Sequence, residues 1–126
     1  MKKIINTKNA PAAIGPYSQA VLVNETLYCS GQIPIDPLTG DLVTGSIEEE
    51  TEQVMENIKA LLSAAKMGLE DVVKCSIFMS SMDYYASINE VYTNYFEVNP
   101  PAREAVAVKT LPKNVNVEIS LIAYRA

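Results

Sequence analysis

The apolar residues of the chain follow two patterns. In several short segments they cluster or alternate with polar residues, and in two longer segments they recur every three or four residues, as on one face of a helix. The short apolar runs are typical of strands, and the residues between them are rich in Pro, Gly and Asn. Strands are predicted at residues 2–6, 17–23, 26–30, 72–79, 103–109 and 115–124. Asn24 and Glu25 are expected to form the turn between the second strand and the third.

Two helices are predicted, at residues 47–66 and 84–98. One apolar stripe recurs at helical spacing in the first of them and consists of Val54, Ile58, Leu61, Leu62 and Ala65. Ser46 and Glu49 have the spacing of a capping box, which favours a helix that begins there. Gly68 is expected to end this helix.

The order of these elements is that of an α+β domain over residues 1–126, with one sheet and two helices. Two helices can cover only one face of the sheet. In the strand at 103–109 both faces are apolar or small, and Ile122 and Tyr124 share a strand face with Glu118. The second face therefore needs another chain to cover it, which predicts a closed homo-oligomer of undetermined subunit number.

The composition is that of an ordinary globular domain. The 126 residues are 48% hydrophobic and 20% charged, and no apolar run is long enough to span a membrane. Residues 1–6 lack a signal-peptide core, so we expect a cytoplasmic protein. The net charge of −5 and the scattered lysines disfavour nucleic acid as a partner.

The chain contains no histidine, which excludes Ser-His-Asp and Cys-His catalysis and most zinc sites. It also contains no glycine-rich nucleotide motif of the GxxxxGK[ST] or GxGxxG kind. Cys29 and Cys75 are far apart and fit no metal-ligand spacing, so we expect buried free thiols and place Cys29 in the core. Any catalysis has to use carboxylate, hydroxyl, thiol, amine, guanidinium or backbone groups.

Arg103 and Glu118 are the main candidates for binding and catalysis. Arg103 is one of two arginines, the only one away from a chain end, and it begins a strand of small residues. Its guanidinium is suited to binding a carboxylate or phosphate bidentately; a structural ion pair is the alternative. Glu118 is expected on the strand face opposite its apolar neighbours, where a partner subunit would bury it and raise its pKa. Tyr17 and Ser30 are the other polar candidates.

Eight short stretches follow one another along almost the whole chain. They read NAPAAIGPYSQ (9–19), SGQIP (30–34), DPLTG (36–40), NIK (57–59), VVK (72–74), NEVY (89–92), PAR (101–103) and VEI (117–119). Together they resemble the Rid family of reactive intermediate deaminases, also called the YjgF family. The joint presence of Arg103 and Glu118 is similar to the RidA branch of that family.

This resemblance implies a chorismate-mutase-like α+β subunit that assembles as a homotrimer with three clefts between subunits. It also implies hydrolysis of small enamine and imine intermediates to 2-oxo acids and ammonia. Such substrates are 2-aminoacrylate, its tautomer 2-iminopropanoate, and 2-iminobutanoate. The chemistry needs positioning and one carboxylate acid/base, so no metal and no organic cofactor are expected.

The implied site consists of the catalytic residues Glu118, Tyr17 and Ser30 and the substrate-binding residues Arg103, Gly31 and Asn89. Arg103 would bind the substrate carboxylate, and Glu118 would handle the hydrolytic water and the protons. Tyr17 and Ser30 would line and polarise the pocket. Gly31 would let the backbone approach the ligand.

Two positions depart from the family pattern. Members often have Ser or Thr where this chain has Glu104, and many RidA proteins have cysteine where it has Ala105. Strand alternation is expected to turn Glu104 away from Arg103. Two other functions stay open: an endoribonuclease, which the acidic chain without histidine disfavours, and a non-enzymatic metabolite-sensing or protein-binding trimer, which the presence of Arg103 and Glu118 disfavours.

Overall fold

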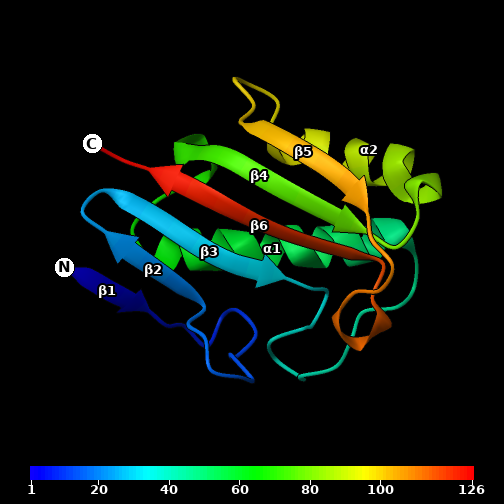
Figure 1. Ribbon diagram of the computed structural model, residues 1–126, viewed down its shortest axis with the longest axis horizontal. Coiled ribbons are helices and arrows are strands. Elements are labelled where there is room, and N and C mark those ends of the chain that lie inside the picture. The colour runs from blue at the N-terminus through cyan, green and yellow to red at the C-terminus, as the bar shows by residue number, and fades with distance from the viewer.

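The computed structural model describes residues 1–126 and contains a six-stranded mixed sheet (Figure 1). Its strands are β1 (Lys2–Ile5), β2 (Ala20–Val23), β3 (Thr26–Gln32), β4 (Val72–Met79), β5 (Ala102–Ala107) and β6 (Val117–Tyr124). They lie in the order β1-β2-β3-β6-β4-β5, so the last strand of the chain is in the interior of the sheet. Every neighbouring pair is antiparallel except β4 and β5, which are parallel.

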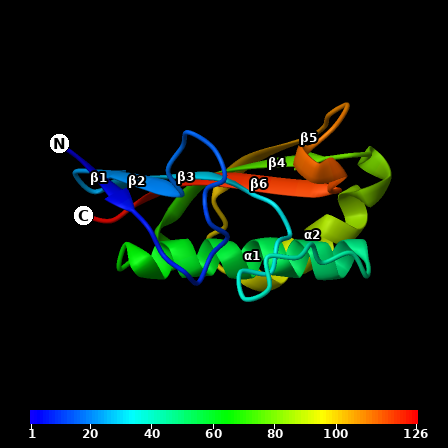
Figure 2. The ribbon, with the colours of Figure 1, turned by 90° about the horizontal axis from the view of Figure 1, so that it is seen from below.

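Both helices lie on the same face of this sheet, as Figure 2 shows. They are α1 (Ile47–Ala64) and α2 (Tyr85–Tyr95). Three short 3₁₀ turns complete the secondary structure: η1 (Leu69–Asp71), η2 (Met82–Tyr84) and η3 (Pro112–Asn114). The arrangement confirms the predicted α+β fold, with one sheet and two helices packed on one of its faces.

The start of α1 is where the local sequence signal predicts it. The Ser46 side chain accepts a hydrogen bond of 3.1 Å from the backbone N–H of Glu49, and the Ser46 backbone is extended at φ −152°. Three acidic residues occupy the first turn, where they complement the positive end of the helix dipole. The predicted apolar stripe faces the sheet and is buried, apart from the partly exposed Ala65 at the end of the helix.

The prediction that Gly68 ends α1 is wrong. The last helical residue is Ala64, and Lys66 adopts the left-handed backbone conformation, at φ 61°. The N–H of Met67 donates to the carbonyl of Leu62 at 2.8 Å, and the N–H of Lys66 donates to that of Ser63 at 2.9 Å. These two bonds are those of a Schellman motif, which here uses a lysine where glycine is the usual residue.

The predicted strand at 17–23 is too long, because its first three residues belong to a loop that the Gln19 side chain organises. Gln19 is buried, and its Nε2 donates to the carbonyl oxygens of Thr7 at 3.0 Å and Pro11 at 2.8 Å. Its Oε1 accepts from the N–H of Thr7 at 2.8 Å. The Gln19 side chain therefore makes hydrogen bonds to the backbone of the N-terminal loop in place of the strand pairing that a longer strand would have made. The other predicted element ends differ from the observed ones by at most three residues.

The hydrophobic core lies between the two helices and the sheet. Alternate residues of β6, namely Val117, Ile119, Leu121 and Ala123, are buried on the helix side. Cys29 and Cys75 belong to the same core as free thiols, as predicted. The opposite face has no helix over it. About half of the surface of three large side chains is exposed there: Tyr28 (50%), Val106 (43%) and Tyr124 (51%). No helix is both long and apolar enough to cross a bilayer.

Candidate active site

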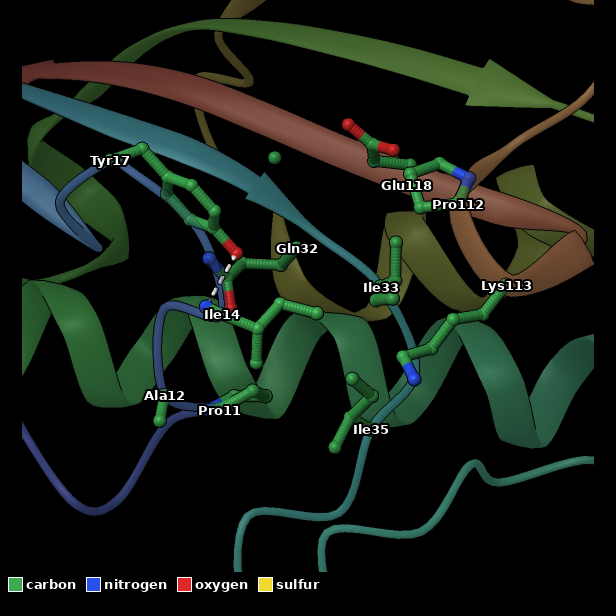
Figure 3. Close-up of a pocket in the computed structure, with 11 residues that line it drawn as sticks. Pro11, Ala12, Ile14, Tyr17, Gln32, Ile33, Ile35, Pro112, Lys113 and Glu118 are labelled. Carbon is green, nitrogen blue, oxygen red and sulfur yellow. Dashed lines mark hydrogen bonds between the residues drawn. The ribbon is translucent and has the colours of Figure 1, made fainter.

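A pocket with a volume of about 340 Å³ lies between the N-terminal loop, the end of β3 and the start of β6 (Figure 3). Aliphatic and proline side chains form most of its wall. It is lined by Pro11, Ala12, Ile14, Tyr17, Gly31, Gln32, Ile33, Ile35, Pro112, Lys113 and Glu118. We call it the Glu118 pocket. Three of the six predicted site residues are therefore brought together here: Tyr17, Gly31 and Glu118.

Glu118 is half-buried on the face of β6 that carries no helix. Its two neighbours in the strand are buried on the helix side, so strand alternation turns its carboxylate to the other face. Neither of the two ion pairs of the chain involves Glu118. Burial raises the pKa of the Glu118 carboxyl group above its ordinary value. A carboxyl group of this kind is suited to both taking up and releasing a proton.

Gly31 packs directly against the Glu118 carboxylate. A Cβ atom at position 31 would lie 2.8 Å from Cδ of Glu118 and 3.0 Å from its Cγ, which is closer than ordinary carbon contacts. The glycine lies where the register between β3 and β6 shifts, between Cys29 and Gln32. The absence of a side chain at this irregularity lets the carboxylate lie against the β3 backbone.

Tyr17 and Ser30 lie on either side of the contact between the N-terminal loop and β3. Tyr17 lines the pocket, and its hydroxyl accepts a long hydrogen bond of 3.5 Å from the N–H of Ile14 (Figure 3). Ser30 does not line the pocket of this chain. Its hydroxyl donates to the carbonyl of Ser18 at 2.6 Å. Ser30 therefore fastens the loop that carries Tyr17 to the strand that carries Gly31.

The structure adds Lys113 to the pocket, a residue that no sequence motif pointed to. Lys113 belongs to η3 and has a left-handed backbone, at φ 55°. In Figure 3 its side chain follows the pocket wall away from Glu118 and toward Ile35. The buried Glu50 of α1 holds the chain that follows η3, because its two carboxylate oxygens accept from N and Nδ2 of Asn116 at 3.1 and 2.9 Å. The available sequence signal was the Pro-Lys-Asn turn shortly before Glu118.

Arg103 lies in a second hollow, of about 430 Å³, between β5 and α2. The hollow is lined by Asn89, Tyr92, Thr93, Phe96, Pro100, Pro101 and Arg103. The guanidinium carbon lies 4.9 Å from the ring centroid of Tyr92 and 5.7 Å from that of Tyr85. Nη2 donates to the Tyr85 hydroxyl at 3.1 Å. The structure thus brings Arg103 and Asn89 together, apart from the other predicted site residues.

Arg103 and Glu118 of one chain lie on opposite faces of the sheet. The β4–β5 register pairs Arg103 with Cys75, which is fully buried under the helices, and pairs Glu104 with Ser76. Glu104 accepts a hydrogen bond from Ser76 on the other face, which confirms that it points away from Arg103. Glu118 is also on that other face. A single chain therefore does not place the guanidinium and the carboxylate in one cavity.

Comparison with known proteins shows one consistent relationship. The sequence profile of the family described as Endoribonuclease L-PSP matches residues 7–125. A RutC family protein of Pyrococcus horikoshii is 52% identical over 125 residues, which are 99% of each chain. The 2-iminobutanoate/2-iminopropanoate deaminase of Bos taurus is 47% identical over 123 residues, which are 98% of this chain and 90% of the bovine one.

The same relationship holds for solved structures. An endoribonuclease candidate from Thermotoga maritima is 56% identical and superposes with a TM-score of 0.98, over 100% of this chain and 99% of that one. The agreement confirms the predicted fold, a chorismate-mutase-like α+β subunit with a single sheet.

Proposed function

The chain belongs to the Endoribonuclease L-PSP family, also known as the YjgF or Rid family, and we propose that it hydrolyses small 2-imino acids and their enamine tautomers. The observation that carries this proposal is the Glu118 carboxyl group. It is half-buried, has no ion-pair partner and faces an aliphatic pocket large enough for a small acid. The bovine relative named 2-iminobutanoate/2-iminopropanoate deaminase supports the choice of substrate class.

In the proposed reaction the Glu118 carboxyl group carries out the acid/base steps of imine hydrolysis. Glu118 takes a proton from water while the water oxygen bonds to C2 of the protonated imine, which yields a carbinolamine. The carboxyl group then returns the proton to the nitrogen. As the C–N bond breaks and ammonia leaves, the Glu118 carboxylate accepts the hydroxyl proton of the carbinolamine, so that the 2-oxo group forms, and it then passes that proton to ammonia or water. An enamine first takes up a proton at C3 to give the imine. No atom needs an external oxidant or reductant, and carboxylate acid/base catalysis contributes about 10²–10⁴-fold.

Arg103 enters this scheme from a neighbouring subunit. It is on the edge strand β5, it has no carboxylate partner, and it is on the sheet face opposite Glu118 of its own chain. The helix-free face exposes several large apolar side chains, as a subunit interface requires. A homotrimer in which Arg103 of one subunit reaches the Glu118 pocket of the next would complete the site, with the guanidinium binding the substrate carboxylate.

Mixing two inactive variants tests this arrangement. Arg103→Ala subunits retain Glu118, and Glu118→Gln subunits retain Arg103. After unfolding and refolding of an equal mixture, random trimers would contain both groups at about a quarter of their interfaces, so about a quarter of the wild-type activity returns. Each variant refolded alone is the control. If the refolded mixture is a trimer by light scattering but regains no activity, the intersubunit site is contradicted. If the wild-type protein is a monomer, no neighbouring subunit can supply Arg103.

The activity itself is tested in a coupled assay. An amino acid oxidase or dehydratase generates the imine in place, and 2-oxo acid formation is followed with and without the protein. We expect wild-type protein to accelerate 2-oxo acid release and Glu118→Gln to lose that acceleration by about 10²-fold or more. Single-stranded RNA in a parallel reaction tests the endoribonuclease alternative. RNA cleavage that depends on Glu118, without imine hydrolysis, would replace the proposal.

A further inference from the structure

Arg103 is held in place by aromatic side chains that leave most of its hydrogen-bonding capacity free. Its only hydrogen bond from the guanidinium is the 3.1 Å bond from Nη2 to the Tyr85 hydroxyl, and no ion pair includes it. Arginine has five N–H donors, so four remain for a ligand. The ring of Tyr92 supports the guanidinium from the core side, at 4.9 Å.

We infer that Tyr85 is a positioning residue, whose hydroxyl orients the Arg103 guanidinium so that its free donors face an incoming carboxylate. This inference rests on the proposed function, since it assigns Arg103 to the substrate carboxylate. Tyr85 is the first residue of α2, and Asn89 and Tyr92 lie four and seven residues later. At this spacing all three side chains share the helix face that borders β5.

A phenol is suited to this role because it orients the arginine without neutralising it. A carboxylate in the same place would form an ion pair and compete with the carboxylate of a ligand. The carboxylate next to Arg103 in the sequence, Glu104, is instead on the other sheet face, where Lys74 pairs with it at 2.9 Å. Hydrogen bonding from Asn89, and next from Arg103, lowers the pKa of Tyr85, in agreement with a hydroxyl oxygen that serves as acceptor.

Orientation in the free protein affects affinity because arginine has many rotamers. A guanidinium that is already held by one hydrogen bond and two rings loses less conformational freedom when a ligand binds. Of the two tyrosines, only Tyr85 can be substituted without disturbing the core. Tyr92 is 5% exposed and belongs to the core, whereas Tyr85 is 37% exposed. Removal of the Tyr85 hydroxyl therefore leaves the core packing unchanged.

The experiment replaces Tyr85 by phenylalanine in the full-length protein and measures binding of 2-oxobutanoate and of its neutral amide, 2-oxobutanamide. We expect the dissociation constant for 2-oxobutanoate to rise about fivefold, the effect of one lost hydrogen bond, with the amide unaffected. KM for the imino acid should rise by a similar factor at nearly constant kcat. Tyr84→Phe is the matched control, because Tyr84 packs against the core and makes no contact with the guanidinium.

The same measurements in an Arg103→Lys background separate this inference from the proposed function. There, Tyr85→Phe should have little further effect, because both residues act on one interaction. Unchanged 2-oxobutanoate affinity in Tyr85→Phe, while Arg103→Lys weakens it, overturns the role of Tyr85 and leaves that of Arg103. Equal weakening of the acid and the amide also overturns it. No effect of Arg103→Lys overturns the proposed carboxylate site as well.

Discussion

Replacement of Gly31 by alanine tests whether the position of the Glu118 carboxylate determines turnover. The backbone accepts the change, because Gly31 is not in the left-handed region. The new Cβ would lie 2.8 Å from Cδ of Glu118, whereas carbon atoms pack at about 3.5–4.0 Å. The carboxyl group therefore has to retreat by roughly 1 Å. It is the far end of a flexible side chain, so it moves and the sheet does not.

A displacement of this size has a large effect on catalysis and a small one on stability. A misplacement of about 1 Å can reduce the rate about 10²-fold, which corresponds to about 2.7 kcal/mol in the activation free energy. Overpacking costs about 1–3 kcal/mol in a closed core, and a half-buried carboxylate relaxes more easily. We expect a loss of stability of at most about 1 kcal/mol, or about 4 °C in melting temperature.

The assay compares steady-state imine hydrolysis and thermal melting of Gly31→Ala with those of Gly68→Ala. Position 68 is a matched control, since a Cβ there would lie 2.8 Å from Cδ of Glu70, an exposed residue remote from the pocket. Gly68→Ala should keep full turnover. A double variant of Gly31→Ala with Glu118→Gln should be no slower than Glu118→Gln alone. Turnover of Gly31→Ala within about threefold of wild type, in a folded protein, would show that the carboxylate position does not limit the rate.

Three further predictions follow from the site and the core. Arg103→Lys keeps the charge but loses the bidentate geometry of the guanidinium, so kcat/KM should fall about 10–100-fold while light scattering shows an intact oligomer. Near-wild-type kinetics would show that the guanidinium does not bind the substrate carboxylate. Burial raises the pKa of Glu118 in the folded state above its value in the unfolded state. The wild type therefore loses stability as the pH rises from the unfolded-state pKa through the folded-state pKa. Glu118→Gln should therefore melt at or above the wild-type temperature near neutral pH, and the difference should vanish below about pH 4; a much lower melting temperature at neutral pH would indicate a structural role instead. Burial raises the pKa of Cys29 to about 12 and also raises that of Cys75, so neither thiol should react with iodoacetamide at about pH 8 until the protein is unfolded; rapid alkylation of the native protein would contradict the buried assignment.

The elements with a local or periodic signal were predictable from the sequence. The capping box at Ser46 and the apolar stripe after it determine where α1 begins and which side it buries. Strand alternation likewise predicts that Glu118 points to the face opposite Val117, Ile119 and Leu121. The family motifs identify the candidate site residues one by one. None of these inferences requires knowledge of which strands are neighbours.

The tertiary structure decided how those residues are grouped. The parallel β4–β5 register places Arg103 beside Cys75 on the helix face, and so separates it from Glu118. The positions of Tyr85 and Lys113 beside the two hollows depend in the same way on how α2 and η3 return to the sheet. Register and crossover are contacts between residues far apart in the chain, and no local propensity encodes them.

Local conformation departs from the prediction in two places. Lys66 takes the left-handed position that Gly68 was expected to provide, and the Gln19 side chain replaces strand pairing at residues 17–19. At Lys66 the hydrogen bonds that end the helix outweigh a left-handed backbone cost of about 1–2 kcal/mol. Local patterns in the amino-acid sequence were thus enough to predict the elements, their buried faces and the candidate chemistry. That Arg103 and Glu118 of one chain lie in two separate hollows follows from the pairing of strands far apart in the sequence, which no local pattern encodes.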